Sequence, residues 1–366
     1  MKDKKSPGKI IFYINVLCKG GAERVILQLA RRFSCEGYKS IIVTSFEAKD
    51  EYEVPEGVER ISMEKEETPR SRLKKNIFRI KALREICKRE KPDLLISFMQ
   101  EPNFRAILAT LGLPVKTLVS VRNDPSREYA GKVGKIVGKF ILPMADGCVF
   151  QTSDAQAWFP KRLQKKSAII MNEVSETFFN VTRENTSNIV TVGRLSEQKN
   201  HKMLIRAFGS IASKHPDQNL LIYGEGNARH ELEQLIESLN LDERVMLMGN
   251  TSDVPGVLSK ASIFVLSSDY EGMPNALLEA LAVGVPSVST DCPCGGPKSI
   301  IEHGANGLLV PVGNQAAIAD AMDKLLSDNN FAQKIGFMAK ERASLYAPDK
   351  IFDMWKTFAE GIMYEY

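Results

Sequence analysis

Two carboxylates, Glu271 and Glu279, have seven residues between them and flank a turn that suits ligand binding. The second lies in an apolar run, residues 275–283, which reads as a helix. Pro274 suits the first turn of that helix, so the free N–H groups of about residues 273–276 are expected to hold an anion. The stretch therefore predicts an anion-binding helix start with two carboxylates beside it.

A strand, a loop, a helix and a second strand must position this pair. Residues 261–266 and 285–289 are rich in β-branched and apolar side chains, so they read as buried strands on either side of the helix. Gly284 is the expected stop of the helix. This order is a βαβ unit of a parallel sheet, in which ligands bind at the carboxyl ends of the strands. Glu271 is therefore expected at the ligand-binding edge, with Glu279 one helical turn further along.

The string EGMPNALLEALAVGVPSV resembles the paired-glutamate motif of retaining glycosyltransferases of family 4, whose architecture is called GT-B. The resemblance covers nearly the whole chain and implies an α/β fold of two Rossmann-like parallel-sheet domains that face a central cleft. It also implies that Glu279 accepts hydrogen bonds from ribose hydroxyls and Glu271 from sugar-ring hydroxyls of a nucleotide sugar. The donor-binding residues implied between the glutamates are Gly272, Met273, Pro274, Asn275 and Ala276.

Arg194 and Lys199 directly follow a predicted strand at residues 189–192. By itself, an Arg and a Lys at this spacing are typical of a solvated surface. In the family that the chain resembles, this string holds the nucleotide diphosphate. Two fixed cations there stabilise the negative charge that grows as the sugar–phosphate bond breaks. The resemblance thus implies a catalytic and donor-binding role for both residues.

Glycines mark two further turns. Gly20 and Gly21 separate a first strand at residues 9–18 from a helix, and glycine there lets the backbone approach a ligand closely. The string GGAERVILQLA resembles the opening of family 4 enzymes, where this loop lies against donor and acceptor.

Gly224 and Gly226 follow a second-domain strand at residues 220–223, without the third glycine of a dinucleotide fingerprint. With Asn250 they resemble the nucleoside pocket of the family. The base would meet mostly backbone there, so uridine and guanosine donors are not distinguished.

Polar residues end two strands of the predicted first domain. Glu101 follows a strand at residues 94–98, and Arg122, Asn123 and Asp124 follow the next strand. Both strand ends are expected to open onto the cleft. Many family 4 enzymes have a histidine at the second of these ends, but this chain has no histidine before residue 201. The role is vacant or falls to Arg122, Asn123 or Asp124, and Asp124 is the catalytic candidate.

The length of 366 residues predicts two domains. A polar stretch at residues 172–188 reads as their connection. The predicted domains are 1–175, which binds the acceptor, and 186–348, which binds the nucleotide sugar; the resemblance implies that a terminal helix, 349–366, returns to the first. Residues 1–180 hold 33 Lys/Arg and 22 Asp/Glu, whereas residues 181–366 hold 16 and 23, so the halves face different partners.

Two basic segments concentrate the positive charge of the first half. Residues 70–91 hold ten Lys/Arg and two Glu on a helical pattern, and residues 131–142 alternate Lys132, Lys135 and Lys139 with apolar side chains. These segments are either ordinary solvated helices or basic faces that lie on an anionic membrane. The second interpretation predicts peripheral contact with the inner face of the cell membrane. A nucleic-acid partner is not expected, because no recognised nucleic-acid motif is present.

The rest of the composition favours a cytoplasmic protein. No apolar run approaches the length of a membrane span, and the early run at residues 10–18 reads as a buried strand instead of a signal peptide. The six cysteines show no paired C-x-x-C spacing, so reduced thiols are expected.

The resulting hypothesis is a retaining transferase that moves a hexose or N-acetylhexosamine, with a UDP-sugar favoured as donor, onto a lipid-linked saccharide of bacterial glycan assembly. The chain has no Asp-x-Asp, so neither a bound metal nor a cofactor is expected. One alternative is a nucleotide-sugar 2-epimerase of the same architecture. Another is a non-catalytic nucleotide-sugar-binding subunit. A dehydrogenase is disfavoured, because no G-x-G-x-x-G follows the first strand.

Overall fold

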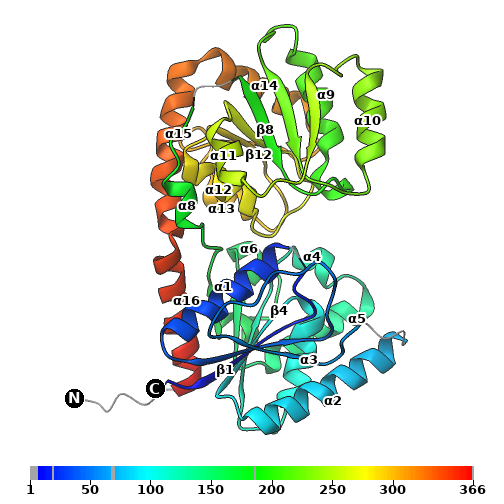
Figure 1. Cartoon of the computed structure of the whole chain (residues 1–366), viewed down its shortest axis with the longest axis vertical. Coiled ribbons are helices and arrows are strands. Elements are labelled where there is room, and N and C mark those ends of the chain that lie inside the picture. Colours follow the sequence, from blue (N-terminus) through cyan, green and yellow to red (C-terminus); the bar gives the residue numbers. More distant parts are fainter. Residues whose placement is uncertain (1–6, 19, 67–70, 185–186, 365–366) are drawn as a thin grey trace, which may run out of the picture. The chain divides into compact units, whose positions relative to one another are not determined.

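The computed structural model describes residues 7–18, 20–66, 71–184 and 187–364. The chain forms two compact units, Met1–Asn172 with Ile351–Tyr366, and Glu173–Lys350. Each unit is a parallel β-sheet with helices on its faces (Figure 1). The predicted features that lie partly outside the described residues are the Gly-Gly turn at Lys19, the basic segment 70–91 at residue 70, the connection at 185–186 and the terminal helix at 365–366.

Unit 1 holds a seven-stranded sheet in which all neighbouring strands are parallel. Its strands, in sheet order, are β3 (Glu59–Ser62), β2 (Lys39–Thr44), β1 (Lys9–Ile14), β4 (Leu94–Phe98), β5 (Lys116–Ser120), β6 (Gly147–Phe150) and β7 (Ser167–Ile169). Its helices are α1 (Gly21–Cys35), α2 (Arg72–Glu90), α3 (Gln100–Thr110), α4 (Pro125–Glu128), α5 (Gly131–Ile136), the π-helical η1 (Val137–Ile141), the 3₁₀ turn η2 (Leu142–Met144), α6 (Ser153–Ala157) and α7 (Lys161–Gln164). Every residue of the central strand β4 is buried, as expected for a parallel strand covered on both faces.

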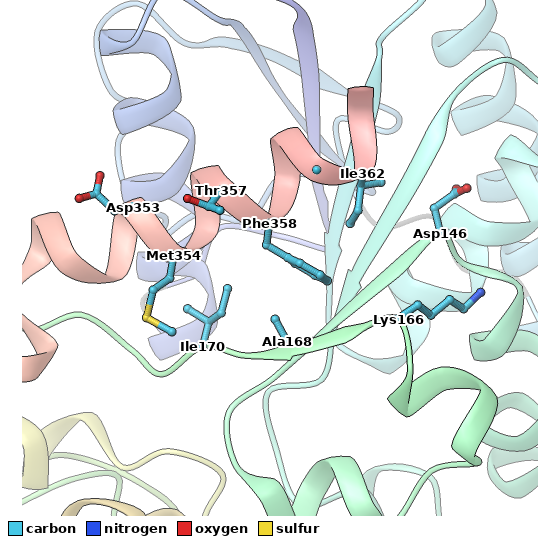
Figure 2. Close-up of a pocket in the computed structure, with 10 residues that line it drawn as sticks. Asp146, Lys166, Ala168, Ile170, Asp353, Met354, Thr357, Phe358 and Ile362 are labelled. Atoms are coloured by element: carbon cyan, nitrogen blue, oxygen red, sulfur yellow. The ribbon is translucent and has the colours of Figure 1, made fainter. Parts of the chain in front are cut away.

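The C-terminal helix α16 (Pro348–Tyr364) packs against unit 1 through its residues after the boundary at Ile351. The Trp355 ring stacks on Phe98 with 5.8 Å between centroids, and Tyr38 donates a hydrogen bond to Glu360 at 2.7 Å. Between β7 and α16 lies an apolar pocket of about 670 Å³, into which Phe358 projects (Figure 2). The terminal helix is therefore part of the core of unit 1.

Unit 2 holds a six-stranded parallel sheet. Its strands, in sheet order, are β10 (Val245–Gly249), β9 (Asn219–Tyr223), β8 (Asn188–Val192), β11 (Ile263–Leu266), β12 (Ser287–Thr290) and β13 (Leu308–Val310). Its helices are α8 (Glu176–Phe179), the 3₁₀ turn η3 (Glu197–Lys199), α9 (His201–Ile211), α10 (Arg229–Ser238), α11 (Val254–Ser259), α12 (Asn275–Val283), α13 (Gly296–Ile300), α14 (Gln315–Ser327), α15 (Asn329–Ala343) and the 3₁₀ turn η4 (Ser344–Tyr346). Strands β8 and β11 are neighbours at the centre, so the loops that follow them meet at one edge of the sheet.

Three short helices have recognisable local features. The N-cap of α6 is Thr152, because the Thr152 hydroxyl accepts the N–H of Ala155 at 3.1 Å. Helix α13 begins at Gly296 with a proline in its first turn. The polar stretch 172–188 contains the short helix α8, which buries the apolar side chain of Phe178.

Candidate functional site

The centre of the site is an ion pair at the carboxyl edge of the unit 2 sheet. Lys199, in the loop after β8, places its Nζ 2.5 Å from Oε1 of Glu271, in the loop after β11. Their side chains are 16% and 9% exposed, so the pair is largely removed from water. Two residues that the sequence assigned to different parts of a nucleotide sugar are thus in direct contact. Before a ligand binds, each neutralises the charge of the other.

A tight turn presents Lys199. The 3₁₀ turn η3 is followed by Asn200 as its C-cap, whose φ of 46° lies in the left-handed region that asparagine tolerates better than most residues. The Asn200 side chain accepts the N–H of Met203 at 3.3 Å and so begins α9. Lys199 is therefore held at the junction of two helical segments.

Four hydrogen bonds tie this turn to the loop of Glu271. Asn200 Nδ2 donates to Asp269 Oδ1 at 2.7 Å, and Ser267 Oγ donates to the carbonyl of Lys199 at 2.8 Å. Gln198 Nε2 donates to the carbonyl of Tyr270 at 2.9 Å, and the Asp269 N–H donates to the carbonyl of Gln198 at 2.9 Å. We call these two loops, residues 196–200 and 267–271, the braced loops. Sequence reasoning missed the brace, although the serine pair after an apolar strand was a signal for it.

Helix α12 begins at Asn275, shortly after the second of the braced loops. It runs from Asn275 to Val283 with Gly284, at φ 83°, as its left-handed cap, which confirms the predicted bounds and stop. The first four N–H groups of a helix have no intrahelical acceptor, so this end offers donors to a ligand. A Cβ on Gly296 would overlap the carbonyl oxygen of Gly272, so α13 approaches the loop closely only because residue 296 is glycine.

The remaining residues predicted around α12 are mostly buried. Gly272, Met273 and Pro274 are buried, whereas Asn275 and Ala276 in the first helical turn are half-buried. Glu279 lies on the second turn and is 6% exposed. The ligand contacts assigned to these residues stay predictions.

A small cavity of about 180 Å³ opens beside the ion pair, after strands β8, β9 and β10. Its lining residues are Val192, Gly193, Arg194, Tyr223, Gly224, Glu225, Asn250 and Thr251. Three residues predicted from separate motifs, Arg194, Gly224 and Asn250, thus share one cavity. Cβ atoms on Gly224 and Gly226 would overlap the carbonyl oxygens of Gly193 and Leu195, so both glycines permit backbone-to-backbone contact that shapes the cavity.

Two titratable groups near the ion pair are held neutral. Burial, and to a lesser degree the charge of Lys199, lowers the pKa of His201 to about 4. Burial raises the pKa of the Cys292 thiol to about 12, and its Sγ donates to the carbonyl of Ser268 at 3.1 Å. At neutral pH the charges at the site are therefore those of Arg194, Lys199 and the acidic side chains.

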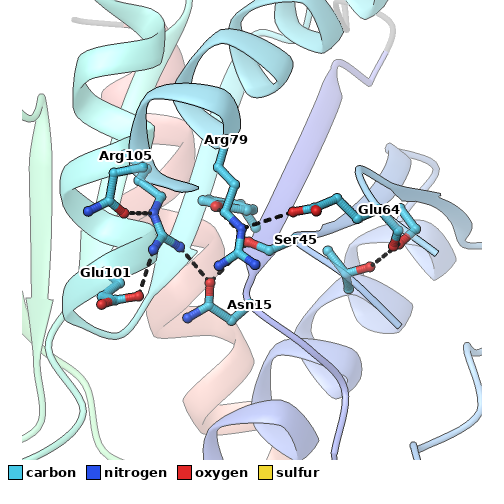
Figure 3. A network of polar contacts seen from close by, with 10 residues as sticks. Asn15, Ser45, Glu64, Arg79, Glu101 and Arg105 are labelled. Carbon is cyan, nitrogen blue, oxygen red and sulfur yellow. Dashed lines mark hydrogen bonds and ion pairs between the residues drawn. The ribbon is translucent and has the colours of Figure 1, made fainter. Parts of the chain in front are cut away.

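In unit 1, Glu101 contacts Arg105 (Figure 3). It pairs with Arg105 at 2.6 Å and with Arg72 at 3.3 Å. Arg105 is almost fully buried and also donates to Asn15 Oδ1 at 2.6 Å. Glu101 thus compensates a buried cation, which the sequence did not indicate.

Arg79 is one of the ten cations of the run 70–91, and it does not belong to the exposed surface of α2. It is buried and donates to Glu64 at 3.4 Å, in the same view (Figure 3). One of the cations counted toward the basic face of α2 is therefore an internal partner of an acid.

The strand-end residues after β5 differ in exposure. Arg122 is buried, lies 4.6 Å from the Phe98 ring centroid and donates to Asn172, and burial lowers its pKa to about 9. Asp124 caps α4 by accepting the Ser126 N–H at 2.9 Å. Asn123 is half-buried and accepts the Asp124 N–H at 2.9 Å. Of the three, Asn123 keeps the most contact with solvent.

The first predicted glycine loop is also in unit 1. Helix α1 begins at Gly21, and Gly20 is its N-cap in an extended conformation. The ligand contacts assigned to Gly20 and Gly21 stay predictions.

Within the part of the chain that the structure describes, no group of three or more His, Cys, Asp or Glu side chains is arranged to hold a metal ion. No described helix combines the length and apolarity needed to cross a membrane.

Comparisons with known proteins find glycosyltransferases along the whole of residues 19–342. A family model described as "Glycosyltransferase Family 4" matches residues 19–174, and one described as "Glycosyl transferases group 1" matches residues 174–342. The chain is 28% identical over 364 residues to a Campylobacter jejuni GalNAc-alpha-(1->4)-GalNAc-alpha-(1->3)-diNAcBac-PP-undecaprenol alpha-1,4-N-acetyl-D-galactosaminyltransferase, covering 96% of this chain and 98% of the relative. It is also 28% identical to the N-acetylgalactosamine-N,N'-diacetylbacillosaminyl-diphospho-undecaprenol 4-alpha-N-acetylgalactosaminyltransferase of that organism, covering 97% and 99%.

Solved structures show the same fold at low sequence identity. HepE of Anabaena, solved with UDP and glucose, superposes with a TM-score of 0.82 at 17% identity, covering 98% of this chain and 100% of that one. The sucrose-phosphate synthase of Thermosynechococcus elongatus superposes with a TM-score of 0.85 at 19% identity, with the same coverage. These likenesses, with the two parallel-sheet units, confirm the predicted α/β GT-B fold class. The two glycosyltransferase family models together match residues 19–342, so the chain belongs to the glycosyltransferases that these models describe.

Proposed function

We propose that this glycosyltransferase moves a hexose or N-acetylhexosamine from a UDP-sugar, with retention of anomeric configuration, onto a lipid-linked saccharide during bacterial glycan assembly. The observation that carries the proposal is the Lys199–Glu271 pair at the sheet edge, beside the cavity lined by Arg194. The printed names of the two Campylobacter relatives, both of which include an undecaprenol diphosphate, support the acceptor class.

On binding, the donor would replace the contact between Lys199 and Glu271 in unit 2 with contacts of its own to these residues. Its diphosphate meets Arg194, Lys199 and the N–H groups at the start of α12, so that three positive centres surround the leaving group. Its ribose hydroxyls donate to Glu279 and its sugar hydroxyls to Glu271. Gly224, Gly226 and Asn250 are assigned to the nucleoside, and the cavity of about 180 Å³ that Gly224 and Asn250 line suits part of that moiety.

The transfer itself would follow a front-side route. The acceptor hydroxyl attacks the anomeric carbon on the face from which UDP departs, a glycosidic C–O bond forms, and the bond from that carbon to the phosphate oxygen breaks. The departing phosphate oxygen takes the hydroxyl proton, so UDP leaves and no protein nucleophile is needed. Arg194 and Lys199 stabilise the charge on the departing diphosphate, which is worth most where water is excluded.

Unit 1 would supply contacts to the acceptor. Glu101, Arg122 and Asp124 have internal partners, so their direct participation requires rearrangement. Asn123 is the least buried of the three residues after β5. We therefore assign it the strand-end position at which many family 4 enzymes have a histidine. Gly20 and Gly21 remain assigned to the loop that meets both substrates.

A basic apolar surface on unit 1 supports peripheral membrane contact. Along α5 and η1, Val133, Ile136 and Phe140 are 74%, 54% and 61% exposed, and three exposed lysines, Lys132, Lys135 and Lys139, alternate with them. At the start of α2, Leu73 and Ile77 are 70% and 46% exposed. Apolar side chains among lysines are typical of a surface that lies on anionic lipid, which would place the enzyme on the inner face of the cell membrane.

The function is tested by incubating purified protein with UDP- and GDP-sugars and an undecaprenyl-diphosphate-linked saccharide, with and without a chelator, and following UDP release and lipid mass. Acceptor-dependent release from one donor, unchanged by the chelator, supports the proposal and identifies the sugar. Conversion of the donor without acceptor indicates the 2-epimerase, and binding without turnover indicates the non-catalytic subunit.

Membrane contact is tested separately by sedimentation with phosphatidylglycerol vesicles. Val133→Ser with Phe140→Ser should reduce binding about tenfold or more, because two exposed apolar anchors are lost. Phe337→Ser, at a side chain 66% exposed in unit 2, is the matched control and should bind normally. Equal binding by both variants would reject the α5 surface as the contact.

A further inference from the structure

The two oxygens of Glu271 have different surroundings. Oε1 accepts two hydrogen bonds, from Lys199 Nζ at 2.5 Å and from Ser268 Oγ at 2.7 Å. Oε2 receives no hydrogen bond from the described residues and is not among their buried unpartnered atoms, so it keeps contact with solvent. One oxygen is thus fixed by the protein and the other is left for a ligand.

Ser268 itself is held in place from the neighbouring strand. Its side chain is fully buried. Its carbonyl accepts Thr290 Oγ1, at the end of β12, at 2.6 Å and Cys292 Sγ at 3.1 Å. Neither contact involves a residue to which we assign a ligand contact. These two contacts to its backbone carbonyl hold Ser268 from outside the residues that we assign to the donor.

Lys199 differs from Ser268 in this respect. Under the proposed function, on which this inference rests, its ammonium group must turn to the donor diphosphate. Glu271 then loses one of its two hydrogen bonds at the moment when it must hold the sugar. A carboxylate released in this way would have to be reordered during the reaction, which lowers the rate.

We propose that Ser268 is a positioning residue that acts through Glu271. Its hydroxyl keeps Oε1 fixed when Lys199 turns to the diphosphate, and Oε2 thereby stays available to the sugar hydroxyls. Ser268 does not touch the substrate in this scheme. Its hydroxyl would be the contact that survives the exchange of partners between the free and donor-bound enzyme.

The first experiment compares Ser268→Ala with Ser287→Ala in the sugar-transfer assay with a UDP-sugar. Ser287 is an equally buried serine in β12, but its hydroxyl donates only to the nearby carbonyl of Val285 at 2.8 Å. The S268A change should lower kcat about tenfold to a hundredfold, the value of a hydrogen bond to a charged group, with the KM for the donor changed less than about threefold. S287A should keep kcat within about threefold of the wild type.

The second experiment is a double-mutant cycle with Glu271→Gln. If Ser268 acts through Glu271, S268A should change the kcat of the E271Q enzyme by less than about twofold. A full additional loss in the E271Q background would overturn the positioning role, because a purely structural effect would persist there. Equal activity of S268A and S287A would also overturn it.

A third variant distinguishes a folding defect in S268A from the loss of the hydrogen bond. If S268A melts below S287A, Ser268→Cys keeps the shape of the side chain but supplies a weaker donor, and it should reproduce the loss of kcat. Full activity of S268C would overturn the role of the hydroxyl. Wild-type protein that transfers no sugar from any donor would instead reject the proposed function, and this inference with it.

Discussion

The ammonium nitrogen of Lys199 lies 2.5 Å from Oε1 of Glu271, across two loops that are 72 residues apart in sequence. The contact makes Lys199 both an internal partner of a buried carboxylate and the proposed ligand of the diphosphate. Removal of the Lys199 side chain should therefore lower both the stability of the fold and the turnover.

Lys199→Ala should lower turnover on the order of 10²–10³-fold, by analogy with the loss of one preorganised donor to a developing anion. It should also lower the free energy of unfolding by about 1–3 kcal/mol, because Glu271 is left buried without its cation. Sugar transfer and urea unfolding measure the two effects. Lys202→Ala is the control, since its partially exposed pair with Glu231 lies outside the site; an equal loss of turnover there would contradict the assignment.

Arg194→Ala should lower turnover by a similar factor, on the order of 10²–10³-fold, with the free energy of unfolding unchanged. The Arg194 side chain is exposed and makes no ion pair with the residues that the structure describes. Loss of this side chain should therefore leave the stability of the fold unchanged. Arg206→Ala, at an exposed position on α9, should leave both quantities unchanged. Unchanged turnover in R194A would remove Arg194 from the diphosphate site.

Gly224→Ala should destabilise unit 2 and weaken UDP binding. The residue has φ of 138°, and an added Cβ would overlap the Gly193 carbonyl in the cavity wall. Gly313→Ala is the control that separates backbone strain from overlap in the cavity wall. Gly313 also has a positive φ, of 74°, but open space where its Cβ would stand. The affinity for UDP, measured by calorimetry, should fall at least about tenfold in G224A and should not fall in G313A. Equal UDP affinities would place the nucleoside elsewhere.

Glu128 should make unit 1 less stable as the pH rises. Burial raises the pKa of its carboxyl from 4.5 to about 7, although Oε1 accepts the N–H of Gln100 at 2.7 Å. The folded state thus favours the protonated acid. Its contribution to stability is fully present below pH 4.5 and is lost as the pH rises to about 7.

Glu128→Gln retains a carbonyl acceptor and removes the titration. It should flatten the decline in unfolding free energy between pH 4.5 and about 7, a difference on the order of 2–3 kcal/mol. Urea denaturation at several pH values provides the measurement. Glu85→Gln, at a carboxylate 69% exposed, should leave the decline intact, and the same slope in E128Q and the wild type would contradict the prediction.

The sequence by itself determined the elements and the edge of the sheet on which the site lies. The apolar run 275–283 and the glycine after it fixed α12 and its end, because helical periodicity and a left-handed cap are encoded within a few residues. Apolar strands that alternate with helices fixed the parallel sheets, and the carboxyl ends of their strands fixed the place of Arg194, Lys199 and Glu271.

Only the tertiary structure decided which side chains meet. Ser268 reaches Glu271, Glu101 compensates the buried Arg105, and Arg79 turns inward to Glu64, none of which follows from local pattern. A strand or helix forms from the types of neighbouring residues, but a hydrogen-bond partner is chosen by the register of strands and the packing of loops far apart in sequence. Lys199 and Glu271 are recognisable separately in the sequence, and their contact exists because β8 and β11 are neighbours in the sheet.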